Sequence, residues 1–151
     1  MKNRILLLFI SVLSLTSAYS QTVKYNLDKK FIAEGYDVVS YFDNKAIEGS
    51  DNYIYTYNTV MLKFSNQANL NLFKSNPEKY FPQYGGWCAY AMGLNGDKVT
   101  IDPKTFEIRD GKLYLFYNSW GTNTLELWLE NNPVKLNTTA KVNWNKTKYK
   151  K

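Results

Sequence analysis

The stretch Phe106-Glu107-Ile108-Arg109-Asp110-Gly111-Lys112-Leu113-Tyr114-Leu115-Phe116-Tyr117 decides the fold class of this chain. Two runs of aliphatic and aromatic residues flank an Asp-Gly pair, which favours the positive φ angles of a type I′ turn. The stretch therefore predicts two long antiparallel strands. Leu113 and Leu115 are expected on one face of the second strand, because successive side chains alternate. Tyr114 and Phe116 then lie on the opposite face.

The flanking sequence predicts a second hairpin and several short helices. Residues 53–57 alternate aromatic and smaller β-formers, and residues 60–64 follow Asn58-Thr59 as their partner. Residues 35–42 are predicted to form a turn and a short apolar strand. Helices are expected after Ser65 as N-cap, over residues 87–92, after a capping box at residues 123–126, and from Pro133. No internal repeat is visible, and the class is α+β: a small antiparallel sheet and hairpins with short helices packed against it.

The N-terminal residues carry the pattern of a secretory signal peptide. Lys2 and Arg4 precede an apolar run over residues 5–15, and small residues lead to a predicted cut between Ser20 and Gln21. The expected organisation is a signal peptide at 1–20, a polar leader at 21–33, one folded domain at 34–145 and a basic tail at 146–151. A periplasmic or secreted protein is predicted.

The positive charge is concentrated at the C-terminus. The net charge of +6 falls to +4 without Lys2 and Arg4, and five lysines occupy the last eleven positions. Residues 21–140 are nearly neutral, so no basic face indicates nucleic acid as a partner. No stretch after the signal reaches the length of a membrane-spanning helix.

The chain contains one cysteine and no histidine. A single cysteine forms no internal disulfide, and the usual general base of a Ser or Cys nucleophile is missing. An enzyme is therefore not expected, and the question becomes what Cys88 does.

Four motifs in order resemble the YHS domain family, and more closely its exported, single-domain bacterial members. They are Gly-Tyr-Asp-x-Val-x-Tyr-Phe at 35–42, Phe-x8-Phe-x2-Asn-Pro-Glu-Lys-Tyr at 64–80, Pro-Gln-Tyr-Gly-Gly-Trp-Cys-Ala-Tyr-Ala at 82–91 and Asp-Gly-Lys-Leu-Tyr-Leu-x-Tyr-Asn at 110–118. The resemblance runs from about Glu34 to Trp144. It implies heavy-metal binding, since shorter YHS domains and the related TRASH domains carry cysteines for soft metals. In those domains, an Asp-Pro-Val-Cys-like segment comes early and a Tyr-His-Ser segment precedes the helix. Here Asp37 to Ser40 and Lys63 to Ser65 take their places, so both likely metal-ligand positions are lost.

Two hypotheses for Cys88 follow. Cys88 and Met92 are four residues apart on a predicted helix, and a thiolate with a thioether favours Cu(I), with Met61 as a third ligand. Alternatively, Cys88 and Met92 are buried core residues, as free cysteines and methionines commonly are. In the core hypothesis, Cys88→Ser costs more stability than Cys88→Ala, because it buries a hydroxyl without a partner.

The aromatic residues suggest a binding surface. Tyr84, Trp87 and Trp120 are candidates for contact with a small ligand or a protein partner, and Gly85-Gly86 permits a close backbone approach. The function predicted from sequence is an extracytoplasmic YHS-type accessory domain with a copper or heavy-metal role. The alternative is a ligand- or protein-binding module in which Cys88 is purely structural.

Overall fold

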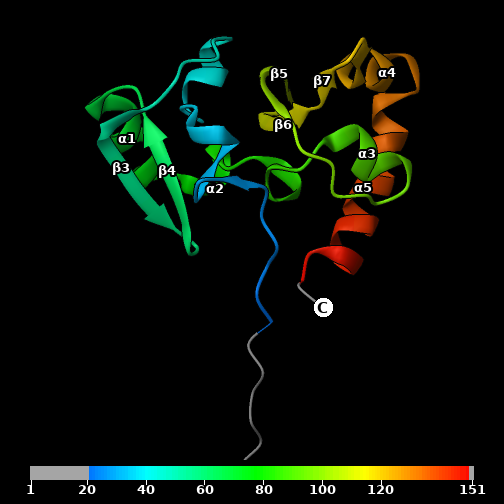
Figure 1. The fold of residues 1–151 in the computed structure, drawn as a ribbon, viewed down its shortest axis with the longest axis horizontal. Coiled ribbons are helices and arrows are strands. Elements are labelled where there is room, and N and C mark those ends of the chain that lie inside the picture. The colour runs from blue at the N-terminus through cyan, green and yellow to red at the C-terminus, as the bar shows by residue number, and fades with distance from the viewer. Residues whose placement is uncertain (1–20, 150–151) are drawn as a thin grey trace, which may run out of the picture.

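The computed structural model describes residues 21–149, so the predicted signal peptide and its cleavage point lie outside the described residues. Two antiparallel hairpins organise the fold (Figure 1). The first joins β3 (Ser50–Tyr57) to β4 (Val60–Phe64), and the second joins β5 (Asp102–Arg109) to β6 (Lys112–Phe116). The Asp110-Gly111 turn has φ angles of 51° and 68°, as a type I′ turn requires. The α+β class and both hairpin predictions are confirmed.

Both faces of β6 are buried. Leu113 and Leu115 belong to a core cluster shared with the first hairpin, whereas Tyr114 and Phe116 pack in a second cluster around Trp128. The predicted alternation is therefore confirmed, and β6 lies between the two cores of the molecule.

The helices begin at or near the predicted capping signals. They are α1 (Gln67–Ser75), α2 (Pro77–Tyr80), α3 (Ala89–Leu94), α4 (Thr124–Glu130) and α5 (Pro133–Thr147). Asn123 caps α4 and its amide donates to Glu126, and Pro133 is the first residue of α5. The helix expected from Trp87 begins only after Cys88, because both residues have extended backbone angles.

Residues 21–33 are part of the fold and not a leader, which corrects that prediction. Strand β1 (Leu27–Asp28) pairs with β2 (Phe31–Ile32), and β2 runs parallel to β4 with Phe31 opposite Met61. The sequence concealed these strands because each is only two residues long. The segment before them is also bonded, since the Lys24 amide donates to the carbonyl of Lys148 and Val23 bridges to Tyr149. The expected basic tail therefore begins inside α5 and continues into this contact.

No strand forms over residues 36–42, contrary to expectation. Two 3₁₀ turns, η1 (Ala33–Gly35) and η2 (Ser40–Asp43), occupy the region instead. The buried carboxylate of Asp37 fixes this path by accepting hydrogen bonds from the Val39 amide and from the amide and hydroxyl of Ser65. Ser65 is consequently not a helix cap, and Asn66 caps α1.

The two hairpins repeat one another residue by residue. Strands β3 and β5 each have eight residues, and β4 and β6 each have five. Ser50 pairs with Phe64, and Asp102 pairs with Phe116; each position in the second hairpin lies 52 residues after its counterpart. Both registers also shift at the same place, immediately after these pairs.

The segments before the hairpins match as well. Residues 33–35 and residues 84–86, which belong to the 3₁₀ turn η3 (Gln83–Gly86), all have positive φ, and an extended aromatic residue follows each turn. The next residues are Asp37 and Cys88, whose amides donate to the carbonyls of Ile47 and Val99. Asp37 and Cys88 therefore occupy equivalent places.

The helices after the hairpins complete the repeat. Asn66 caps α1 and Asn123 caps α4, and each helix is followed by an Asn-Pro pair that begins α2 or α5. The chain thus contains two copies of one supersecondary unit, here called unit A (residues 33–80) and unit B (residues 84–147). Unit B alone carries a small extra hairpin, β7 (Asn118–Ser119) with β8 (Thr122–Asn123). No repeat is visible in the sequence, because equivalent positions share geometry more often than residue type.

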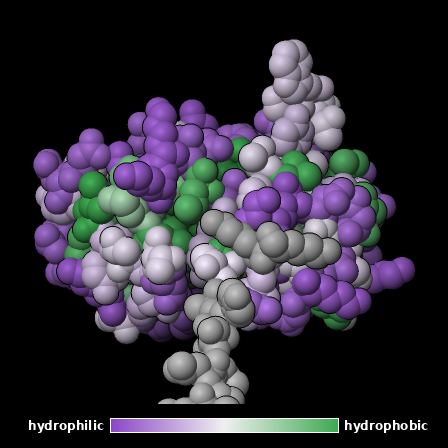
Figure 2. All heavy atoms as spheres, turned by 60° about the horizontal axis from the view of Figure 1, so that its bottom comes forward, coloured by the Kyte–Doolittle hydropathy of each residue, from purple (hydrophilic) through white to green (hydrophobic). Residues whose placement is uncertain are grey.

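The described surface is largely hydrophilic, and its apolar side chains lie in small groups in the view of Figure 2. Within residues 21–149, no helix combines the length and apolarity needed to cross a membrane.

Candidate ligand-binding cleft

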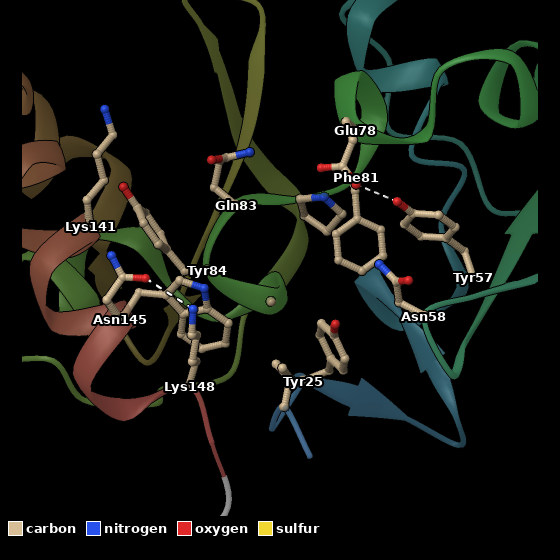
Figure 3. Close-up of a pocket in the computed structure, with 14 residues that line it drawn as sticks. Tyr25, Tyr57, Asn58, Glu78, Phe81, Gln83, Tyr84, Lys141, Asn145 and Lys148 are labelled. Carbon is tan, nitrogen blue, oxygen red and sulfur yellow. Dashed lines mark hydrogen bonds between the residues drawn. The ribbon is translucent and has the colours of Figure 1, made fainter. Parts of the chain in front are cut away.

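A cavity of about 380 Å³ lies between unit A and unit B. Unit A contributes the tip of its hairpin and the residues around α2, and unit B contributes η3 and the last turns of α5 (Figure 3). The N-terminal segment adds Val23 and Tyr25. Small-molecule sites commonly occupy such boundaries and have volumes of about 300 to 1,000 Å³. We call this cavity the cleft.

Three aromatic rings form the unit A side of the cleft. Phe81 packs edge-on against Tyr25 and Tyr57, with ring centroids 5.8 and 5.7 Å apart. All three side chains are half-buried, so part of each ring faces the cavity (Figure 3). Edge-to-face packing holds the rings in fixed positions.

Trp144 and Tyr84 line the unit B side. A Cβ added to Gly85 would lie 2.7 Å from the Trp144 ring, and Gly85 itself has a φ of +61°. Glycine at this position therefore serves the approach of Trp144 to the η3 backbone. The hydroxyl of Tyr84 donates to the side-chain oxygen of Asn137, and burial raises the pKa of Tyr84. Tyr84 thus contributes a neutral ring.

Charges of opposite sign lie on opposite walls. Glu78 stands beside Tyr57, whose hydroxyl donates to one of its carboxylate oxygens. Lys141 and Lys148 stand on the α5 side, where the Lys148 ammonium donates to Asn145 at 3.2 Å (Figure 3). The pKa of Tyr25 is raised by burial and, to a smaller extent, by the negative charge of Glu78.

Cys88 is fully buried, as the core hypothesis expects. Its sulfur lies 3.4 Å from the Tyr117 amide, which donates to it, and 3.3 Å from the Thr124 hydroxyl. The Thr124 hydroxyl hydrogen is donated to the Tyr117 carbonyl at 2.8 Å, so the thiol is the donor toward Thr124. These bonds fit a protonated thiol that joins β6 to α4.

The residues suggested for copper lie in different surroundings. Cys88 packs in one core cluster and Met92 in the other, although the Met92 amide bonds to the Cys88 carbonyl. Met61 lies on β4 opposite Phe31 and belongs to neither cluster. Among residues 21–149, no group of three or more Cys, Asp or Glu side chains is placed to hold a metal.

The three aromatic residues predicted to contact a ligand lie in three different environments. Tyr84 lines the cleft, whereas Trp87 is buried and its indole N–H donates to the Lys24 carbonyl at 2.8 Å. Trp120 lies outside the cleft, at the tip of the β7–β8 hairpin, and 95% of it is exposed. Trp120 also has a φ of +52°, which is uncommon for a bulky residue.

Sequence reasoning missed most of the cleft. Tyr25 lay in the supposed leader, and Trp144 was not among the predicted site residues. Tyr57, Glu78 and Phe81 belong to separate elements that only the fold brings together. The one usable signal was Tyr84 before Gly85-Gly86.

Comparison of the chain with protein-family models, with curated proteins and with solved structures finds no match. The function of the chain must therefore be inferred from the geometry of the cleft and of Cys88. The resemblance to YHS domains stays a prediction that rests on the four sequence motifs.

Proposed function

We propose that this chain is an extracytoplasmic, YHS-type accessory domain that binds a small ligand in the cleft and is not an enzyme. The observation that carries the proposal is the aromatic cavity between the two units, with polar and charged groups at its edges. Sites of this kind combine apolar walls with a few polar groups that orient the ligand. The export pattern of residues 1–20 supports a periplasmic or secreted location.

In this proposal Cys88 is structural. The buried thiol already donates one hydrogen bond and accepts another, and Met92 packs in a different cluster. These contacts favour ligand binding over copper binding as the function of the domain. A ligand site for soft metals requires an accessible thiolate.

Binding of the aromatic dye 8-anilinonaphthalene-1-sulfonate to the folded protein tests the proposal. We expect one site, and we expect Phe81→Ala and Trp144→Ala to weaken binding about tenfold through loss of ring contacts. Leu72→Ala is the matched control, because Leu72 is exposed on α1 outside the cleft. Far-ultraviolet circular dichroism confirms that each variant is folded. Equal dye affinity in all three variants would reject the cleft as the binding site.

A further inference from the structure

The two walls of the cleft differ in chemistry, and this difference narrows the class of ligand. The unit A wall has three rings and a carboxylate, whereas the α5 wall has two ammonium groups beside an indole. A ligand with one charge would match one wall and leave the charge of the opposite wall unpaired. A ligand with both charges is matched at each end.

We propose that the cleft binds a zwitterionic small molecule, with its alkylammonium group against Tyr25, Tyr57 and Phe81. Its anionic group lies at Lys148, and Lys141 adds positive charge to the same wall. This inference rests on the proposed function and specifies its ligand. The apolar body of the ligand lies between the two ends, near Trp144.

The unit A wall has the parts of an alkylammonium site. The faces of aromatic rings attract cations, and rings grouped around a quaternary ammonium form aromatic cages. Glu78 adds a full negative charge, and Tyr57 is the one described residue that donates to it, through a single carboxylate oxygen. The second oxygen points toward the cavity (Figure 3).

The α5 wall has the parts of an anion site. Lys141 on α5 and its C-cap residue Lys148 are seven residues apart, so both lie on the same side of the helix, about 10 Å apart along its axis. Helix α5 itself contains no acidic residue, and within residues 21–149 neither lysine forms an ion pair. Asn145, between them in sequence, orients the Lys148 ammonium.

Phosphocholine is a suitable probe, because it joins a quaternary ammonium to a phosphate. Isothermal titration should show one site, with choline alone and inorganic phosphate alone each at least about tenfold weaker. Equal binding of inorganic phosphate, or no binding of phosphocholine, overturns the proposal.

Two variants test the two ends separately. Glu78→Gln preserves the acceptor for Tyr57 but removes the charge, and it should weaken phosphocholine about tenfold while leaving phosphate binding unchanged. Lys148→Met should weaken phosphocholine and phosphate alike. Lys146→Met is the control on the same helix, outside the cleft. Unchanged phosphocholine affinity in Glu78→Gln contradicts the alkylammonium site.

A vesicle assay distinguishes a free zwitterion from a lipid headgroup. If phosphatidylcholine vesicles pellet the protein and soluble phosphocholine releases it, the ligand is a headgroup. If phosphocholine binds in solution and the protein does not sediment with the vesicles, the ligand is a free molecule. If Glu78→Gln sediments with the vesicles as well as the unmodified protein does, the headgroup does not bind in the cleft.

The dye assay and the phosphocholine titration fail separately. If the dye binds as expected but phosphocholine does not bind, the zwitterionic ligand is rejected and the proposed ligand-binding function is retained. If the dye assay fails, the proposed function itself is rejected.

Discussion

A single sulfur atom connects three parts of unit B. Cys88 precedes α3, accepts from the end of β6 and donates to the first residue of α4. Asp37 does the corresponding work in unit A, where its carboxylate accepts from Ser65 and Asn69. The equivalence explains why an unpaired cysteine is kept here: the position needs a buried acceptor for the residue that follows the hairpin.

This arrangement reverses the order of mutational effects expected from sequence. Cys88→Ala leaves the Tyr117 amide without its partner and should cost about 2 kcal/mol of unfolding free energy. Cys88→Ser retains a donor and an acceptor and should cost about 1 kcal/mol. Urea denaturation measures both. A larger loss in the serine variant would show that its shorter side chain fails to reach either partner.

The native thiol should also react slowly with Ellman's reagent. Cys88 has no exposed surface, so modification requires local opening. Urea-unfolded protein is the control and should react at once. Rapid labelling of the folded protein would contradict the structural assignment of Cys88.

Asp37 should be the more costly residue of the equivalent pair. Asp37→Asn turns one acceptor oxygen into a donor that faces the Ser65 amide or the Asn69 side chain, and it should cost about 2 to 3 kcal/mol. Asp43→Asn is the control, since Asp43 is exposed at the end of η2. Thermal unfolding of the two variants should differ clearly. Equal melting temperatures would show that the carboxylate is dispensable.

At the scale of elements, the hairpins and the approximate helix starts could be predicted, but the positive φ angles before each hairpin could not. Asp110-Gly111 and Asn132-Pro133 have strong local preferences, so their geometry follows from residue type. Ala33, Glu34 and Tyr84 have positive φ although such residues rarely adopt it. No local sequence preference predicts these angles. The strand expected over 36–42 is absent because the Asp37 carboxylate fixes another path there.

Two glycine substitutions distinguish the cost of an unfavourable φ angle from the cost of a steric clash. Gly111→Ala meets no atom within 4 Å, so its positive φ alone should cost about 1 kcal/mol. Gly85→Ala adds a clash with Trp144 and should cost at least about 2 kcal/mol. It should also weaken dye binding, because Trp144 must move. Equal stability of the two variants in urea would mean that Trp144 does not pack against η3.

On the scale of the whole molecule, the repeat could not be recognised in the sequence, because equivalent positions carry different residue types. Equivalent turns are Asn58-Thr59 and Asp110-Gly111, and equivalent buried acceptors are Asp37 and Cys88. Strand register and cap geometry are the conserved quantities, and neither is visible as sequence identity. The cleft could not be predicted either, because it forms only where the two units meet.

The N-terminal segment should be essential to this assembly. Deletion of residues 21–26 removes the bonds from Lys24 to Lys148 and from Asn26 to Gly85, together with the Tyr25 ring. The unfolding free energy should fall by about 3 kcal/mol, and dye binding should weaken. Deletion of residues 21–22 alone is the control, because both are exposed. A dispensable leader would leave both quantities unchanged in the longer deletion.

The bridge between Val23 and Tyr149 orders events in time. A ribosome or a translocation pore releases residue 23 long before residue 149, and a contact that spans nearly the whole described chain forms slowly. Unit A can bury its hairpin while unit B is still being delivered, but Val23 and Lys24 gain their backbone partners only after α5 has emerged. The segment after α5 therefore fixes the start of the described chain, and the cleft wall formed by α5 is completed only after residues 133–149 have been synthesised.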